Sequence, residues 1–408
     1  MSQKAQKNTR KKASKKAATS VRAKRGAAAR VVQADPASAQ EEATAAAQPI
    51  SALRARIDAI DERIHELLNE RARVAREVGA SKAAQGMHTA DFYRPEREAQ
   101  VLRKAIERNR GPLSNAEIAR LFREIMSACL AQEEPLKVAF LGPEGTFSQQ
   151  AVLKHFGHSV RALPLAAIDE VFLEVQAGHA DFGVVPVENS TEGTVNNTLD
   201  MFLSSPLKIC GEVELRIHQH LMGRMLSLED IRRVCSHQQS LAQCRHWLDE
   251  HLPGIERLAV SSNAEAARRA RDEEGTAAIA GQTAAEVYGL QIIEPQIEDR
   301  PDNTTRFLVV GRKLFEPSGQ DKTTLLLSGG DTRSPGALHR LLEPLARHGI
   351  SMTRIESRPS RRRKWDYVFF IDVEGHANTA PLKEALAELQ EQASLFRVLG
   401  SYPCAVVV

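Results

Sequence analysis

An apolar pattern at helical spacing begins near Ser51 and runs without a break for about 30 residues. Its large apolar side chains recur at steps of three and four residues, with charged side chains between them: Leu53, Ile57, Ile60, Ile64, Leu67, Leu68, Val74 and Val78. This spacing predicts one amphipathic helix that is unusually long for a compact domain.

Two more helices are expected before residue 135. Pro95 suits the first turn of a helix over 95–109, and Ser114 with Glu117 forms a capping-box pattern for a helix that ends near residue 134. No strand pattern occurs in this region, so residues 49–134 are predicted to form an all-α domain.

The chain before this helical region differs in composition. Residues 1–48 consist almost entirely of Lys, Arg, Ala, Ser, Thr and Gln, and residues 1–30 hold eleven basic side chains and no acidic one. Such a segment buries too little apolar surface to offset its ordering entropy, so a disordered basic tail is predicted. The tail is interpreted as a solvated arm, with nonspecific contact with nucleic acid and a transit peptide as alternatives.

Strand and helix patterns alternate after residue 135. Buried strands are expected at 138–142 and 181–187, and a further one at 305–311, so residues 136–312 are predicted to form an α/β domain. A polar linker over 313–322 follows. Residues 323–402 then give the order βαββαβ, the ferredoxin-like split motif, with a basic turn at 361–364.

Several classes of protein are excluded by simple counts. No window approaches the roughly 18 apolar residues of a membrane span. The five cysteines are an odd number without a CxxC pair, which argues against a disulfide framework or a structural zinc site. A reducing cytoplasm is therefore the expected location.

The helical domain holds basic residues that a simple amphipathic helix does not require. Arg71 and Lys82 are eleven residues apart and share a helix face, whereas Arg54 lies about 25 Å from Arg71 along the same helix. One small ligand cannot contact both arginines of one helix, so a shared site needs Arg54 from a second chain. The alternative is a solvated charged face.

The sequences LRARIDAIDERIHELLNERARVAREVGASK, YRPEREAQVL and LFREIMSACLAQE resemble the all-helical chorismate mutase family, which forms intertwined dimers. The resemblance implies a substrate site with Arg54 from the partner chain, and with Lys82 and Glu133 in catalysis. The matched positions are Arg54, Arg71, Lys82, Arg94, Arg97, Glu98, Cys129 and Glu133. Arg94, Cys129 and Glu133 replace an aspartate, a serine and a glutamine that are common in the family. A cationic site suits a pericyclic rearrangement that needs no acid, base or metal.

Polar clusters in the α/β domain follow strand ends. They lie at 142–148, 187–194, 236–240, 261–263 and 304–307, each expected to precede a helix. Helix N-termini can bind carboxylates, and the alternative is plain N-capping. GxSxG, HExxH and Walker patterns are absent from the sequence.

The combination GPEGTFSQQA, VVPVENSTEGTVNNTLD, SHQQSLAQC and NTTRFLVVG resembles prephenate dehydratase, a two-lobed fold like a periplasmic binding protein. The resemblance implies that Thr305 is essential in catalysis and that no cofactor or metal is needed. Arg306 is a cation suited to a substrate carboxylate. The remaining expected cleft residues are Glu188, Asn189, Ser190, Thr191 and His237.

The motifs Ser334–Leu338 and Ile355–Pro359 resemble those of the ACT regulatory domain, which imply a phenylalanine site between paired domains. The expected effector residues are Gly336, Ala337, Leu338, Glu356, Ser357, Arg358 and Pro359. The alternative for Gly336 is that it serves only helix entry.

All three resemblances together imply a bifunctional enzyme that converts chorismate to prephenate and then to phenylpyruvate, with feedback inhibition by phenylalanine. It would be at least a homodimer in the cytoplasm. The alternative is a non-catalytic amino-acid sensor with the same two-lobed and ACT folds. The intact Thr305-Arg306-Phe307 favours the enzyme.

Overall fold

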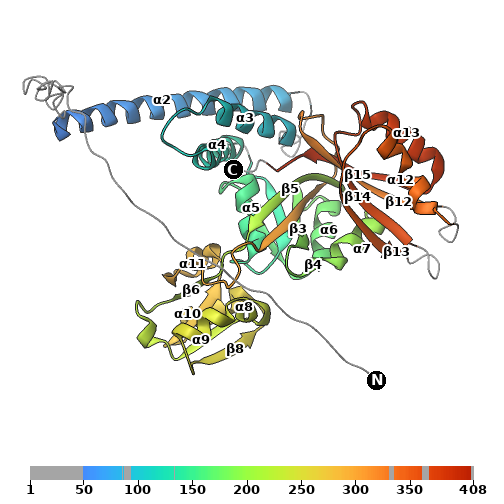
Figure 1. Ribbon diagram of the computed structural model, residues 1–408. Helices are drawn as coiled ribbons and strands as arrows, with labels where there is room; N and C mark the ends of the chain where they lie inside the picture. The colour runs from blue at the N-terminus through green and yellow to red at the C-terminus, as the bar shows by residue number, and fades with distance from the viewer. Residues whose placement is uncertain are drawn as a thin grey trace, which may run out of the picture. The chain divides into compact units, whose positions relative to one another are not determined.

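The computed structural model describes residues 49–84, 86, 93–132, 134–329, 335–360 and 367–405 (Figure 1). The predicted tail at 1–48, the basic turn at 361–364 and Glu133 lie outside the described residues. The chain divides into two compact units, Met1–Ile64 and His65–Val408. No helix within the described residues is long and apolar enough to span a membrane.

The long helix is confirmed as α2, Ile50–Ala83, with 34 residues. Its apolar side chains are exposed along its whole length, for example Ile57 (56%), Leu67 (60%) and Val78 (51%). An apolar stripe of this length on a water-exposed helix is the kind of surface that a second protein chain covers.

Helices α3, Pro95–Arg108, and α4, Asn115–Leu130, pack against each other. The capping box is confirmed, because Ser114 Oγ accepts from the Glu117 backbone N–H while the Glu117 carboxylate accepts from that of Ser114. Tyr93, just before α3, is buried in an aromatic cluster with Phe156 and Phe182 of the α/β domain. The start of α3 is thereby fixed to that domain.

The first α/β lobe is built on a sheet of strand order β2-β1-β3-β11-β5, with β4 paired to β3. The strands are β1 Lys137–Leu141, β2 Arg161–Leu165, β3 Phe182–Asn189, β4 Gly193–Thr194, β5 Lys208–Arg216 and β11 Thr304–Gly311. Helices α5 Phe147–Phe156, α6 Ile168–Ala177 and α7 Asn196–Ser204 belong to this lobe. Strand β11 lies between β3 and β5 and runs antiparallel to both.

The second lobe is inserted between β5 and β11. Its sheet has the order β10-β6-β9-β7-β8, from β6 His220–Gly223, β7 Arg233–His237, β8 Glu256–Val260, β9 Thr276–Ala280 and β10 Gln291–Glu294. Its helices are η2 Leu228–Asp230, α8 Gln238–Gln243, α9 Arg245–His251, α10 Asn263–Asp272 and α11 Gln282–Tyr288. The chain crosses between the lobes twice, which gives the expected two-lobed architecture.

The C-terminal domain follows the predicted βαββαβ order. It consists of β12 Asp321–Gly329, α12 Ala337–Arg347, β13 Met352–Pro359, β14 Tyr367–Glu374, α13 Leu382–Gln392 and β15 Ala393–Pro403. The sheet order is β13-β14-β12-β15, and both helices cover one face of it (Figure 1). The opposite face shares an apolar core with the first lobe, in which Phe370, Leu399 and Tyr402 join Phe202 and Ile209.

The prediction of a polar linker over 313–322 is wrong at its C-terminal end. Asp321 and Lys322 belong to β12, and Ser318 and Asp321 are buried. Ser318 Oγ donates to Asp321, and Arg103 of α3 donates to Ser318 and to the Gln320 carbonyl. These polar groups bind one another, which is why a stretch that looks solvated in the sequence is packed in the structure.

Candidate active site

A cleft of about 670 Å³ lies between the two α/β lobes. The first lobe contributes Thr191 and Glu192 from the turn after β3. The second lobe contributes His237, and the segment before β11 contributes Arg300 and Asn303. Further lining residues are Gln238, Gln239, Ala242, Gln243, His246, Glu298 and Asp299.

A chain of side-chain hydrogen bonds leads from this cleft to Thr305. Asn189 Nδ2 donates to Thr305 Oγ1 and to Asn303 Oδ1, both at 2.8 Å. Asn189 Oδ1 accepts from the backbone N–H groups of Thr191 and Glu192, both at 2.9 Å, which fixes the orientation of the amide. Because an amide N–H can only donate, the Thr305 oxygen accepts here, and its own hydrogen is left to donate elsewhere.

Strand pairing explains this arrangement. Thr305 pairs with Asn189 across β11 and β3, so the two side chains lie on one face of the sheet. Ser190 binds the start of β11 through its backbone N–H to Thr304 O at 2.9 Å and through its Oγ, which accepts from Thr304 N at 3.0 Å. Asn303 was not predicted from the sequence, although it directly precedes β11 and lies two residues before Thr305.

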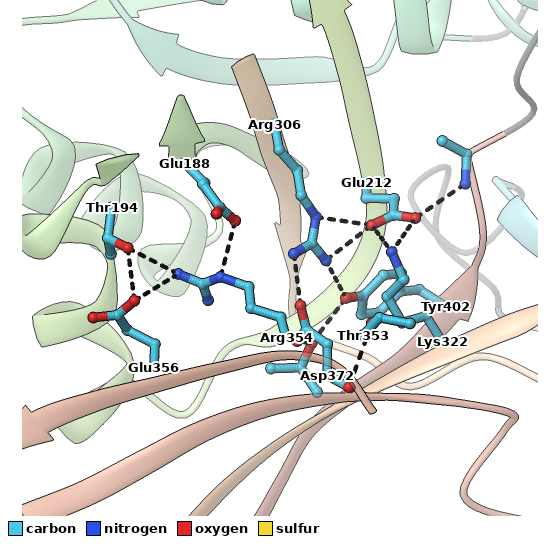
Figure 2. A network of polar contacts seen from close by, with 12 residues as sticks. Glu188, Thr194, Glu212, Arg306, Lys322, Thr353, Arg354, Glu356, Asp372 and Tyr402 are labelled. Atoms are coloured by element: carbon cyan, nitrogen blue, oxygen red, sulfur yellow. Dashed lines mark hydrogen bonds and ion pairs between the residues drawn. The ribbon is translucent and has the colours of Figure 1, made fainter. Parts of the chain in front are cut away.

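Arg306 does not face the cleft. Neighbouring residues on a strand point to opposite faces, and Arg306 pairs with Glu188 on the face opposite to Thr305. Its guanidinium binds Glu212 at 2.9 Å, Asp372 of β14 at 2.6 Å and the Tyr402 hydroxyl at 3.1 Å (Figure 2). Burial alone would lower the pKa of Arg306, but Tyr402, Asp372 and Glu212 raise it above its ordinary value.

The structure therefore places neither Glu188 nor Arg306 in the lining of the cleft. Glu188 Oε2 lies 2.9 Å from Arg354 Nε of β13, so this carboxylate also faces the C-terminal sheet. The TRF motif thus has two faces, with Thr305 hydrogen-bonded to Asn189 on one face and Arg306 bound to the C-terminal domain on the other.

His237 lines the cleft at the first residue before α8, and its Nδ1 accepts from the Gln239 backbone N–H at 3.4 Å. Ser262 caps α10, and Asn263 Oδ1 accepts from Ser236 and Ser240, so these groups are structural. The expectation of a following helix is wrong for 304–307, because these residues open strand β11.

The mutase candidates are less closely grouped. Arg54, Arg71, Arg94 and Arg97 are exposed, and Lys82 and Cys129 are partly buried. Arg94 lies 3.5 Å from Glu96. Glu98 faces α4 and lies 3.6 Å from Arg123 Nε, so it does not point in the same direction as Arg97.

Glu98 and the neighbouring His155 have strongly shifted pKa values. Burial raises the pKa of Glu98 to about 7, against the lowering effect of Arg123. Burial and, to a smaller extent, the nearby Arg123 together lower the pKa of His155 to about 3. His155 Nε2 lies 3.0 Å from the Tyr93 hydroxyl, which connects the helical domain to α5.

The effector candidates divide between the two faces of β13 and the start of α12. Gly336 has φ of +73° and precedes α12, a left-handed conformation that favours glycine. Ala337 is partly buried, and Leu338, Ser357 and Pro359 are exposed. Glu356 accepts from Thr194, and Arg358 binds Asn196 and Asp200, so both side chains face the first lobe, and their place in an effector site stays a prediction.

The chain combines a helical domain, a two-lobed α/β domain with a polar cleft, and a ferredoxin-like domain. This combination is that of a multidomain enzyme with an attached regulatory domain. Family models match as chorismate mutase type II over 53–134, prephenate dehydratase over 138–314 and ACT domain over 324–391. A bifunctional chorismate mutase/prephenate dehydratase of Stutzerimonas stutzeri is 58% identical over 364 residues, which cover 88% of this chain and 99% of the relative. The chain belongs to the bifunctional chorismate mutase/prephenate dehydratase family.

Solved structures resemble about two thirds of the chain. A prephenate dehydratase from Arthrobacter aurescens in complex with L-Phe has a TM-score of 0.60 and 37% identity, covering 66% of this chain and 90% of that one. GqqA, described as a novel type of quorum quenching acylase, has a TM-score of 0.61 and 32% identity, covering 66% of this chain and 98% of that one.

Proposed function

We propose that this chain catalyses two successive reactions. Its helical domain converts chorismate to prephenate, and its two-lobed domain converts prephenate to phenylpyruvate, carbon dioxide and water. L-Phenylalanine binding to the ACT domain lowers the second activity. Family membership supports both activities, and the L-Phe-bound structure of a related prephenate dehydratase supports the effector.

The observation that supports the dehydratase most strongly is the hydrogen bonding of Thr305. In the reaction, the bond from the ring to one carboxylate breaks, its electron pair enters the ring, and the ring hydroxyl leaves as water. Asn189 donates to the Thr305 oxygen, so the Thr305 O–H is free to pass its proton to the departing hydroxyl, which leaves as water, and Thr305 then regains a proton from the solvent. The ring becomes aromatic, which supplies the driving force.

Prephenate carries two carboxylates, so its cleft needs a cationic or hydrogen-bonding partner for them. Arg306 is occupied by Glu212 and Asp372 on the other face of the sheet. Arg300 lines the cleft beside Asn303, and we assign to its guanidinium the binding of a substrate carboxylate. His237, which also lines the cleft, is a second partner.

The mutase reaction requires a homodimer in this proposal. The exposed apolar face of α2 is the surface for the second chain, and Arg54 and Arg71 are about 25 Å apart along one helix. Arg54 of one chain then completes the site that contains Arg71 and Lys82 of the other. All five cysteines are free thiols, in keeping with a cytoplasmic enzyme.

The test follows both reactions with purified full-length protein. Chorismate consumption reports the mutase, and phenylpyruvate formation from added prephenate reports the dehydratase. Direct assay is needed because the same fold occurs in a protein described as an acylase. Thr305→Ala should abolish phenylpyruvate formation and leave chorismate consumption intact, whereas Thr305→Ser, which keeps the hydroxyl, should retain part of the activity. Wild-type protein that binds phenylalanine but forms no phenylpyruvate would favour the amino-acid sensor instead.

A further inference from the structure

Strand β13 presents three alternate charged side chains to the first lobe, namely Arg354, Glu356 and Arg358. Figure 2 shows Arg354 and Glu356. Residues two apart on a strand lie on the same face, so one edge strand of the C-terminal sheet makes all three contacts. Ser357 and Pro359, between and after them, are exposed on the other face.

These contacts reach both ends of one short segment, residues 188–194. At the first end, Arg354 Nε lies 2.9 Å from Glu188 Oε2. At the second end, Thr194 Oγ1 donates to Glu356 Oε2 at 2.8 Å and accepts from Arg354 at 3.4 Å. Beyond it, Arg358 binds Asn196 at 2.7 Å and Asp200 at 2.8 Å in α7.

The segment bounded in this way contains the residues that form one wall of the cleft. Asn189 donates to Thr305, and Thr191 lines the cleft. Glu188 precedes Asn189 directly, so a shift of the Glu188 backbone moves the amide that orients Thr305. The C-terminal domain therefore contacts segment 188–194, and it contributes none of its described residues to the lining of the cleft.

The burial of the partners indicates what this contact does. The Arg354 side chain is 10% exposed, whereas Glu188 is 41% and Glu356 31% exposed. Loss of Arg354 would leave two carboxylates that water can solvate, so the fold would lose little stability. The segment would nevertheless lose its ionic contact with β13.

We propose that Arg354 is a positioning residue for the dehydratase, and that β13 transmits phenylalanine binding to the cleft through it. This inference rests on the proposed function and extends it by naming the contact through which the regulatory domain acts. Phenylalanine at the exposed face of β13 shifts the strand, the contact with Glu188 shifts with it, and Asn189 loses its alignment with Thr305.

The test uses the full-length chain with Arg354→Ala. If only about one molecule in ten then has the segment in its competent conformation, and substrate selects that conformation, KM for prephenate rises about tenfold while kcat is unchanged. Phenylalanine should no longer change KM. Partial misfolding would lower kcat and leave KM unchanged, so the two causes are separable. Arg354→Lys, which keeps the charge, should give an intermediate KM.

Arg347→Ala is the matched control, because this arginine pairs with Glu388 inside the C-terminal domain. It should keep wild-type KM and inhibition. If Arg354→Ala behaves like Arg347→Ala, the inference is overturned, and the proposed function still stands as long as wild type forms phenylpyruvate. If Arg354→Ala does not fold, as judged by lost mutase activity, Glu356→Ala replaces it. A KM for Glu356→Ala equal to that of wild type would equally overturn the inference.

Discussion

Glu98 provides a quantitative test of how the helical domain is attached to the α/β domain. Its side chain is 17% exposed, lies near Arg123, and has a pKa of about 7 instead of the ordinary 4.5 because it is buried. A carboxyl group with a raised folded-state pKa favours the fold when protonated. Its stabilising effect is complete below pH 4.5 and is lost as the pH rises toward 7.

The magnitude follows from the size of that shift. An interval of about 2.5 pH units corresponds to about 3 kcal/mol of folding free energy, of which about 2.5 kcal/mol falls between pH 5 and pH 8. Glu98→Gln removes the titrating group with little change in shape. The free energy of unfolding of this variant, relative to wild type, should therefore rise by about 2.5 kcal/mol from pH 5 to pH 8.

Urea unfolding followed by circular dichroism at pH 5, 6, 7 and 8 measures this difference. His155 contributes in the opposite sense, because its pKa is lowered to about 3 and the unfolded chain takes up a proton below pH 6.5. Since both proteins contain His155, its contribution cancels in the difference. Glu107→Gln on the exposed side of α3 is the matched control and should run parallel to wild type. Parallel curves for Glu98→Gln and wild type would refute the reasoning.

Three further predictions concern shared sites, buried charge and the substituted mutase position. Arg54→Ala and Arg71→Ala should each lack mutase activity. Mixing the two variants should restore it, because in the heterodimer one site carries both changes and the other site carries neither. No recovery of activity after confirmed subunit exchange would contradict a shared site. Arg306→Met should lower the free energy of unfolding by about 3 kcal/mol or more, because it leaves Asp372 buried without its cation. Adding Asp372→Asn should recover part of this loss in urea titrations. Strictly additive effects of the two substitutions would count against the pair. Glu133→Gln should raise the mutase rate near pH 8 and flatten the rise of the rate at low pH, since a glutamine donates a hydrogen bond at any pH. Identical pH profiles of the two proteins from pH 5 to 9 would exclude a role of Glu133 at the ether oxygen of chorismate.

The predictions that succeeded rest on local signals. Three of them depend only on short segments: the capping box at Ser114 and Glu117, the spacing of apolar residues in α2, and the βαββαβ order. Such segments show the same pattern in the sequence as in the folded chain. Thr305 and Asn189 could be placed together from the resemblance alone, and their direct hydrogen bond agrees with that placement.

The predictions that failed depend on which domain packs against each face of a strand. Arg306 and Glu188 were assigned to the cleft from the family resemblance, together with their neighbours Thr305 and Asn189. The alternation of β11 and β3 turns them toward the C-terminal sheet, and sequence alone does not show that a third domain covers that face. Glu356 and Arg358 likewise face the first lobe, and their place in an effector site stays a prediction.

The position of β11 in the first-lobe sheet has a consequence for biosynthesis. β11 lies between β3 and β5, yet the chain reaches it only after the whole second lobe has been made. During translation the first lobe therefore has an open gap in the middle of its sheet until residue 311 has left the ribosome. The helical domain precedes this gap in the chain, whereas the strand with Thr305 is the last part of the two-lobed domain to emerge. A nascent chain stalled before that strand would expose two unpaired strand edges, which makes the interval between β5 and β11 the period when this protein most needs protection from aggregation.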